Sequence, residues 1–461
     1  MIRKYFGDRA FYRRVIAVAL PIIIQNGIGN FVSLLDNIMI GQVGTLQMSG
    51  VSIVNQLMFV FNLCIFGATS GAGIFTAQFH GCGDHEGIRH TFRFKQMVGV
   101  LLSAVGIGTF LLAGNTLIRF YLSGEGSAAD AASILDFGHE YLLVMLWGLP
   151  AFAMSNAYAS TLRESGETMV PMIASTVAVF TNLLLNWILI FGRLGFPALG
   201  VTGAAIATVI SRYVELGIVA SWTHLHNDKM PFIEGAYRSF AIPVSLLKKV
   251  ITKGMPLLIN EALWSIGMVT INQCYSTRGL DVVPAQNISS TLYNLSSVVF
   301  LAMGSSVGII IGQMLGANKS EEEVRDTDRK LIVASVLSCL IFGTFMAAIS
   351  GLFPMLYNTT DAVRDLAAKL ILISALFLPF NAYTNAAYFT LRSGGQTMVT
   401  FLFDSCFVWA FCVPLAFILS RFTSLPILPL YFICCSTDLV KTAIGAFMIK
   451  QGKWIQNLTT K

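Results

Sequence analysis

A stretch of 22 residues occurs twice in this chain. Residues 149–170 read LPAFAMSNAYASTLRESGETMV, and residues 378–399 read LPFNAYTNAAYFTLRSGGQTMV. Identical residues at this offset of 229 include Pro150/Pro379, Asn156/Asn385, Thr161/Thr390, Leu162/Leu391, Arg163/Arg392, Gly166/Gly395, Thr168/Thr397 and Met169/Met398. Nearer the N-terminus, identical residues at an offset of 235 are Pro21/Pro256, Ile24/Ile259, Asn37/Asn272, Gly44/Gly279, Gly73/Gly308, Gln78/Gln313 and Gly81/Gly316. The chain is therefore built from two copies of one unit.

The composition indicates that most of these residues lie in lipid. Of 461 residues, 55% are hydrophobic and only 12% are charged, and the mean hydropathy is +0.70. A soluble protein carries roughly 25% charged residues. These values exclude a set of soluble domains, a disordered chain, a disulfide scaffold and a nucleic-acid-binding protein. The eight cysteines show no C-x-x-C or Cys/His spacing, so we expect no Cys/His metal centre, and no cofactor apart from a coupling ion.

The hydropathy pattern predicts an all-α integral membrane protein with twelve spanning helices. A span needs about 20 mostly apolar residues. The stretches that qualify are 15–40, 51–77, 96–120, 141–161, 170–191, 201–222, 255–274, 288–311, 331–353, 367–391, 399–419 and 425–449. We expect two pseudo-symmetric six-helix lobes, residues 1–222 and 253–461, joined by a polar linker at 223–252. Parallel repeats of this kind place a cavity at their interface, although a channel could share the symmetry.

The distribution of Lys and Arg predicts the orientation in the membrane. With the N-terminus in the cytoplasm, 22 of these residues lie on the cytoplasmic side and 6 on the other, while Arg212 and Lys441 lie within spans. Cytoplasmic loops of membrane proteins carry such an excess. We therefore expect a multi-pass protein of the plasma membrane with both termini and the linker in the cytoplasm. The net charge of +6 then reflects orientation and not a partner site.

The first span carries a polar stripe. Asn26, Asn30, Ser33 and Asn37 have the spacing of one helical face, and Asp36 lies about 100° from Asn37. In the seventh span, the repeat places a matching stripe at Glu261, Ser265, Met268 and Asn272. Ionisable groups within a membrane are costly and mark functional sites. We interpret both stripes as facing a substrate cavity; the alternative is ordinary hydrogen bonding between helices.

A second polar pair lies in the fifth span, where Asn182 and Asn186 are separated by one helical turn. Their counterparts in the repeat are Phe411 and Leu415, so the scaffold itself does not need them. Carboxylate and amide oxygens suit a hard cation such as Na⁺. If the helices meet, Asp36, Asn182 and Asn186 would supply three oxygens, and Thr208 could add a fourth. The alternative interpretation is polar packing between helices.

Other polar residues within the spans leave two interpretations open. In the tenth span, Asn381 and Asn385 follow helical spacing near Phe377, which suits either the wall of a substrate cavity or plain packing. The pairs Arg212/Glu215 and Asp438/Lys441 are spaced i, i+3, so each pair is expected to neutralise itself. Asp404 has no partner close in sequence. No nucleotide-binding loop or hydrolase motif is present, so energy would have to come from an ion gradient.

Taken together, these features resemble the multidrug and toxic compound extrusion (MATE) family of secondary transporters, and within it the NorM-like branch. The resemblance covers nearly the whole chain. Its most specific pieces are residues 34–41 (LLDNIMIG), 162–168 (LRESGET), 182–187 (NLLLNW) and 200–208 (GVTGAAIAT). Each piece alone is moderate evidence for the resemblance, but together, in this order and at this spacing, they are strong evidence.

The resemblance implies a V-shaped pair of lobes around a central cavity. It also implies that the protein extrudes small organic compounds, driven by inward movement of Na⁺ or H⁺. On this resemblance the protein is expected to be a transporter and not an enzyme. The family's cation site corresponds here to Asp36, Asn182, Asn186 and Thr208, and Glu261 matches an acid of the NorM-like branch. The tenth-span acid of that branch is replaced by Asn381, which puts a second cation site in doubt.

We expect a monomeric multidrug exporter in the lipid bilayer that contributes to antibiotic resistance and favours cationic substrates. The substrate cavity would be lined by Asn26, Asn30, Asn37, Glu261, Asn272, Phe377, Asn381 and Asn385. The alternatives are a flippase for lipid-linked precursors of the same superfamily, which the acids within the membrane disfavour, and an exporter of one specific metabolite.

Overall fold

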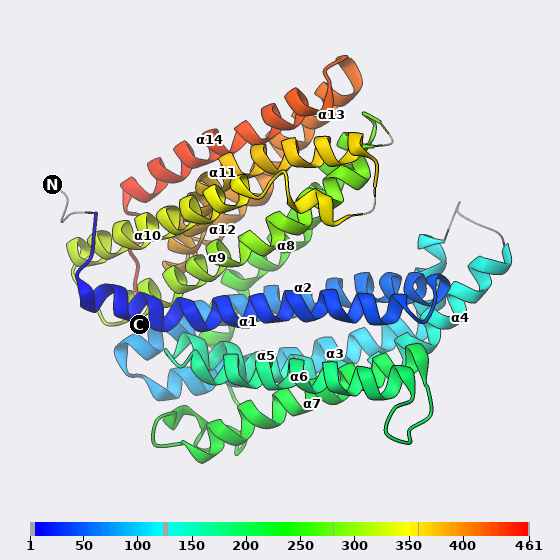
Figure 1. Cartoon of the computed structure of the whole chain (residues 1–461). Coiled ribbons are helices and arrows are strands. Elements are labelled where there is room, and N and C mark those ends of the chain that lie inside the picture. The colour runs from blue at the N-terminus through cyan, green and yellow to red at the C-terminus, as the bar shows by residue number, and fades with distance from the viewer. Residues whose placement is uncertain (1–4, 123–127, 280, 358, 460–461) are drawn as a thin grey trace. The chain divides into compact units, whose positions relative to one another are not determined.

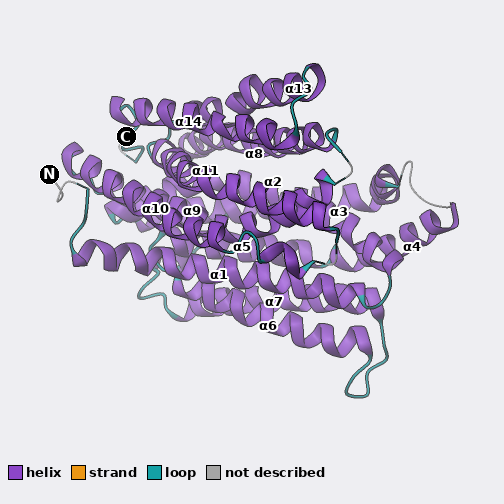
Figure 2. Ribbon diagram, turned by 45° about the horizontal axis from the view of Figure 1, so that its top comes forward, coloured by secondary structure: helices purple, strands orange, loops and turns teal. Residues whose placement is uncertain are grey.

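The computed structural model describes residues 5–122, 128–279, 281–357 and 359–459 and consists there of helices and loops (Figures 1 and 2). The first half contains α1 (Arg9–Gly41), α2 (Thr45–Cys82), α3 (His85–Tyr121), α4 (Ala128–Met145), α5 (Gly148–Glu164), α6 (Met169–Phe191) and α7 (Gly200–Leu225). The second half contains α8 (Val244–Ser276), α9 (Val282–Gly316), α10 (Glu321–Ala348), α11 (Asp361–Ser393), α12 (Thr397–Phe401), α13 (Val413–Phe422) and α14 (Ile427–Gln451). The all-α prediction is confirmed.

Eleven of the described helices are long and apolar enough to cross a membrane, and a bent pair of helices raises the number to twelve. That pair is α4 and α5, which meet at an angle of 49°. The sequence predicted a span at 141–161, which falls across this pair. Pro150 lies in the first turn of α5, where its missing N–H costs nothing, so the chain can begin a new helix there.

The predicted span at 399–419 is also irregular. Between α12 and α13 the helix passes through two π-helical segments, Leu402–Cys406 and Val408–Cys412. Such wider turns are rare and are frequently found at functional sites. This segment carries Asp404.

The chain forms two compact units. One consists of Ile24–Thr76 and His85–Lys248, and the other of Met1–Ile23, Ala77–Asp84 and Lys249–Lys461. The first unit has a core that includes Val54, Ile65 and Leu142. In the second unit α9 is the most buried of the spanning helices. Other large apolar side chains, such as Leu101 and Leu112 of α3, are exposed, as expected where a helix faces lipid.

The predicted linker at 223–252 is folded. The helix α7 extends to Leu225, a 3₁₀ turn forms at Pro231–Ile233, and α8 begins at Val244. Arg93 of α3 donates to the backbone carbonyls of Gly235 and Ala236 at 2.8 Å, and Phe232 is buried. The segment up to Lys248 therefore belongs to the first unit.

One pair of repeat-related glycines lies at a close crossing of two backbones. A Cβ on Gly81 of α2 would meet the backbone carbonyl of Gln313, and a Cβ on Gly316 of α9 would meet that of Gln78. The sequence repeat had paired Gly81 with Gly316 and Gln78 with Gln313. The C-terminal ends of α2 and α9 therefore cross at equivalent positions of the repeat, and both ends belong to the second unit.

We expect Gly316→Ala to destabilise the protein strongly, because the neighbouring atoms are backbone and have little freedom to move. Overpacking of this kind costs about 1–3 kcal/mol. Thermal unfolding of the detergent-purified protein measures the effect. The matched control is Gly108→Ala in α3, where a new Cβ meets nothing within 4 Å. A helical Gly→Ala change without a clash should be neutral or stabilising, by about 0.5–1 kcal/mol. Equal midpoints for the two variants would contradict the tight crossing.

Candidate functional site

The structure brings together the four residues predicted to hold a cation. Asp36 comes from α1, Asn182 and Asn186 from successive turns of α6, and Thr208 from α7. The amide nitrogen of Asn186 donates to the Asp36 carboxylate at 2.7 Å and to the Asn182 oxygen at 3.1 Å. The Asn182 nitrogen donates to the Thr208 hydroxyl at 3.2 Å. All four belong to the first unit.

The amide of Asn182 can serve this cluster in two orientations. In one, its oxygen faces the Asp36 carboxylate, which also offers only acceptor atoms, so this contact is unfavourable. Turned about, the amide nitrogen donates to the two carboxylate oxygens at 3.1 and 3.0 Å, and the amide oxygen accepts from Thr208. With the nitrogen turned toward Asp36, the amides of Asn182 and Asn186 both donate to the carboxylate.

The chemistry of this cluster fits a hard monovalent cation. Asn186 is almost fully buried, and its amide oxygen has no hydrogen-bond partner among the described residues. Carboxylate, amide and hydroxyl oxygens are the ligands that such ions prefer. Within the described chain Asp36 forms no ion pair, since the nearby Arg212 pairs with Glu215 at 3.1 Å. The predicted Arg212/Glu215 pair is thus present.

Sequence reasoning missed one neighbour of this cluster. Tyr141 of α4 is buried and lies close enough to Asp36 and Thr208 to interact with both. Its hydroxyl donates to the Asn55 side chain of α2 at 3.4 Å. The only signal in the sequence was a tyrosine at the edge of an apolar stretch, which also fits packing.

A different polar network occupies the second unit. Tyr388 of α11 donates to Glu261 of α8 at 3.3 Å. Lys441 of α14 forms an ion pair at 2.5 Å with Asp404, the residue for which the sequence offered no partner. Lys441 thus makes its direct ion pair with Asp404 and not with Asp438 as expected, although Asp438 still interacts with the ammonium electrostatically. Spacing along one helix shows which residues share a face, but a neighbouring helix can offer a closer carboxylate.

The other predicted cavity residues lie on α1 in the first unit and on α8 and α11 in the second. Asn26 and Asn30 of α1 are exposed, and so is Asn272 of α8, which accepts from Gln286 at 2.8 Å. The side chain of Asn37 lies outside the described residues. Asn381 and Asn385 are partly buried on α11, with Asn381 donating to the Phe377 carbonyl at 3.2 Å. Phe377 is buried against Phe432. Their role in substrate binding stays a prediction.

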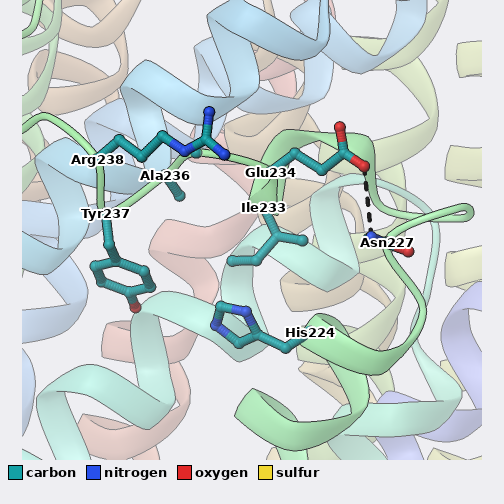
Figure 3. Close-up of a pocket in the computed structure, with 8 residues that line it drawn as sticks. His224, Asn227, Ile233, Glu234, Ala236, Tyr237 and Arg238 are labelled. Atoms are coloured by element: carbon teal, nitrogen blue, oxygen red, sulfur yellow. Dashed lines mark hydrogen bonds between the residues drawn. The ribbon is translucent and has the colours of Figure 1, made fainter.

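The folded linker forms a pocket of about 410 Å³ (Figure 3). Its lining includes His224, Glu234, Tyr237 and Arg238. The side-chain nitrogen of Asn227 donates a hydrogen bond to the Glu234 carboxylate at 3.4 Å. None of the predicted site residues lines it.

Comparison with known proteins relates the whole chain to one family. The MatE family model matches residues 21–188 and 256–419. A probable multidrug resistance protein NorM of Thermotoga maritima is 24% identical over 448 residues, covering 96% of this chain and 93% of the relative. A probable multidrug resistance protein YoeA of Bacillus subtilis is 24% identical over 429 residues, covering 90% and 89%.

Solved structures share the fold. An outward-facing multidrug resistance MATE family transporter superposes with a TM-score of 0.85 at 20% identity, covering 98% of each chain. The Vibrio cholerae MATE transporter VcmN superposes with a TM-score of 0.84 at 18% identity, covering 97% of this chain and 98% of its own.

Proposed function

Because this chain belongs to the MatE family, and is a NorM-like MATE transporter, we propose that it is a secondary exporter of organic compounds. Inward movement of Na⁺ or H⁺ drives the export by alternating access. The multidrug names of the relatives support a broad substrate range. The observation that carries ion coupling is the Asp36 carboxylate, which lies against the neutral amides of Asn182 and Asn186 and forms no ion pair among the described residues.

The Asp36 cluster would couple the ion to transport through differential binding. An ion drives a conformational change only if it binds one state better than the other. Asp36, Asn182 and Thr208 lie on three different helices, so movement of one helix relative to another would change how many oxygens reach the ion. Neutral Asn oxygens can coordinate a metal ion but carry no proton, which favours Na⁺.

Transport in proteoliposomes tests this function. Purified protein is reconstituted, and accumulation of a fluorescent organic cation is followed with a Na⁺ gradient and a H⁺ gradient imposed separately. We expect uphill accumulation with one of them and its collapse when that gradient is dissipated. Downhill flux that is indifferent to both gradients would indicate a channel instead.

We propose that Glu261 helps select cationic substrates. Glu261→Gln removes the charge but keeps an oxygen that can accept from Tyr388. Export of organic cations should fall about tenfold, equivalent to about 1.4 kcal/mol, while export of neutral compounds changes much less. Competition assays with paired cationic and neutral dyes measure this. Tyr388→Phe is the control, since it removes the hydrogen bond and keeps the charge. An equal loss for both dye classes in Glu261→Gln would point to packing.

We propose that the chain is a plasma-membrane monomer with both termini and the linker in the cytoplasm. Lys229 lies exposed in the linker, and Arg193 lies exposed in the loop between α6 and α7. In a background with Cys82→Ser, an impermeant maleimide should label Lys229→Cys only after cells are permeabilised. It should label Arg193→Cys in intact cells. The reverse pattern would invert the topology.

A further inference from the structure

The second unit contains a buried ion pair with the construction of a cation-binding site. The ammonium of Lys441 lies 2.5 Å from one oxygen of Asp404. It also lies 5.4 Å from the centre of the Phe403 ring. A carboxylate on one side and an aromatic face on another are the groups that bind an organic ammonium ion. Both side chains of the ion pair are largely buried, at 13% and 16% exposure.

The other oxygen of Asp404 is held by an amide whose orientation is determined by its neighbours. Asn260 of α8 accepts at its side-chain oxygen from the backbone N–H and the hydroxyl of Ser405, at 3.2 and 2.7 Å. Its nitrogen must therefore point the other way, and it donates to Asp404 at 3.0 Å. This leaves the first oxygen of Asp404 for the ammonium. The carboxylate is thus oriented before any cation binds.

The two units therefore treat an intramembrane aspartate differently. In the first unit Asp36 is surrounded by neutral groups and forms no ion pair among the described residues. In the second unit Asp404 is paired with Lys441, and Asp438 adds a second negative charge near the ammonium. A charge buried in a membrane requires compensation. In the second unit a lysine of the chain itself compensates the charge of the aspartate. In the proposed function, an exchangeable ion compensates the charge of Asp36.

We propose that the Lys441 ammonium is a resident cation filling a monovalent-cation site built around Asp404, Asn260 and Phe403. The site itself takes a primary ammonium ion. The inference rests on the proposed function, because it sets the number of exchangeable coupling ions at one, held at Asp36. It goes beyond that function in assigning a second site and the ligand chemistry of that site.

Chemical rescue tests the proposal. Lys441→Ala removes three methylenes and the ammonium, so n-propylammonium is the missing fragment. Thermal unfolding of the full-length protein is followed in detergent with increasing n-propylammonium chloride, in a background with Asp36→Asn so that the first site does not respond. We expect a saturable rise of at least about 2 °C in the midpoint. Methylammonium and n-pentylammonium should be weaker, because they are too short and too long.

Two controls isolate the site. Asp36→Asn alone keeps Lys441 and should not respond to the amine. Asp36→Asn/Asp404→Asn/Lys441→Ala lacks the carboxylate and should not respond either. A response of Lys441→Ala no larger than in these controls would overturn the proposal. Since Asp36 is absent throughout, the outcome does not depend on whether Asp36 couples transport, which the proteoliposome assay decides separately.

A second variant covers the case in which Lys441→Ala does not fold. Lys441→Gln is one heavy atom shorter than lysine and leaves a gap near Asp404 of about the size of an ammonium ion, for which ammonium, the smallest amine cation, is the probe. Recovery of monodisperse protein only when the amine is present during purification would support the proposal. Absence of an amine effect on both variants would overturn it.

Discussion

Asp36→Asn should abolish cation-driven export while the protein still folds and inserts. The change keeps the size of the side chain and some of its hydrogen bonds, including an acceptor for Asn186. It removes the charge that attracts Na⁺ or H⁺. Without an ion that binds one conformation better than the other, the ion gradient cannot shift the conformational equilibrium. In proteoliposomes, ion-driven accumulation should fall to the level of protein-free vesicles. Substrate affinity, measured by equilibrium binding, should change by less than about threefold, or about 0.6 kcal/mol.

Two kinds of control variant accompany this result. Asn182→Ala and Asn186→Ala each remove one neutral ligand and should weaken the apparent ion affinity roughly tenfold without abolishing transport. Asp228→Asn removes an exposed carboxylate in the linker and should behave as wild type. If Asp36→Asn transports as well as wild type at equal expression, the coupling site is not in this cluster, and Glu261 becomes the next candidate.

Patterns along single helices gave reliable information about which residues share a face. The spacing of Asn182 and Asn186 predicted that both would point the same way, and the structure places both beside Asp36. The repeat paired Gly81 with Gly316, and the two glycines lie at one backbone crossing. In each case the prediction needed only helical periodicity or an internal alignment, which are properties of the sequence itself.

Contacts between helices could not be predicted in the same way. The pairing of Lys441 with Asp404 depends on the packing of α14 against the π-helical segment Leu402–Cys406. A π-helical turn changes the direction of every later side chain, and hydropathy does not reveal it. The folding of the linker on Arg93 also depends on tertiary contacts.

The pair of Lys95 and Glu164 shows the same limitation in a motif that the sequence did single out. Glu164 lies within the LRESGET segment, and Lys95 had been counted only as an orientation signal. In the structure they form an ion pair between α3 and α5, with Lys95 fully buried and also donating to the Thr161 hydroxyl at 3.1 Å. A Cβ on Gly73 would meet the Glu164 carboxylate, so that glycine leaves room for the pair.

We therefore expect Lys95→Met to be among the most destabilising single substitutions in this chain. It leaves the carboxylate of Glu164 largely buried without this partner, and breaking a buried pair costs about 3–5 kcal/mol. Thermal or denaturant unfolding of the purified protein measures the loss. The surface pair of Lys319 and Glu323 is the matched comparison, because both side chains are about half exposed. Lys319→Met should cost less than about 1 kcal/mol.

The double variant Lys95→Met/Glu164→Gln separates the cost of an unpaired charge from the loss of packing. Replacing both partners of a buried pair by neutral groups is often close to neutral in stability. The double variant should therefore be more stable than Lys95→Met alone and should recover most of the lost unfolding free energy. If it is as unstable as the single variant, the shape of the Lys95 side chain, and not the charge left on Glu164, holds α3 against α5.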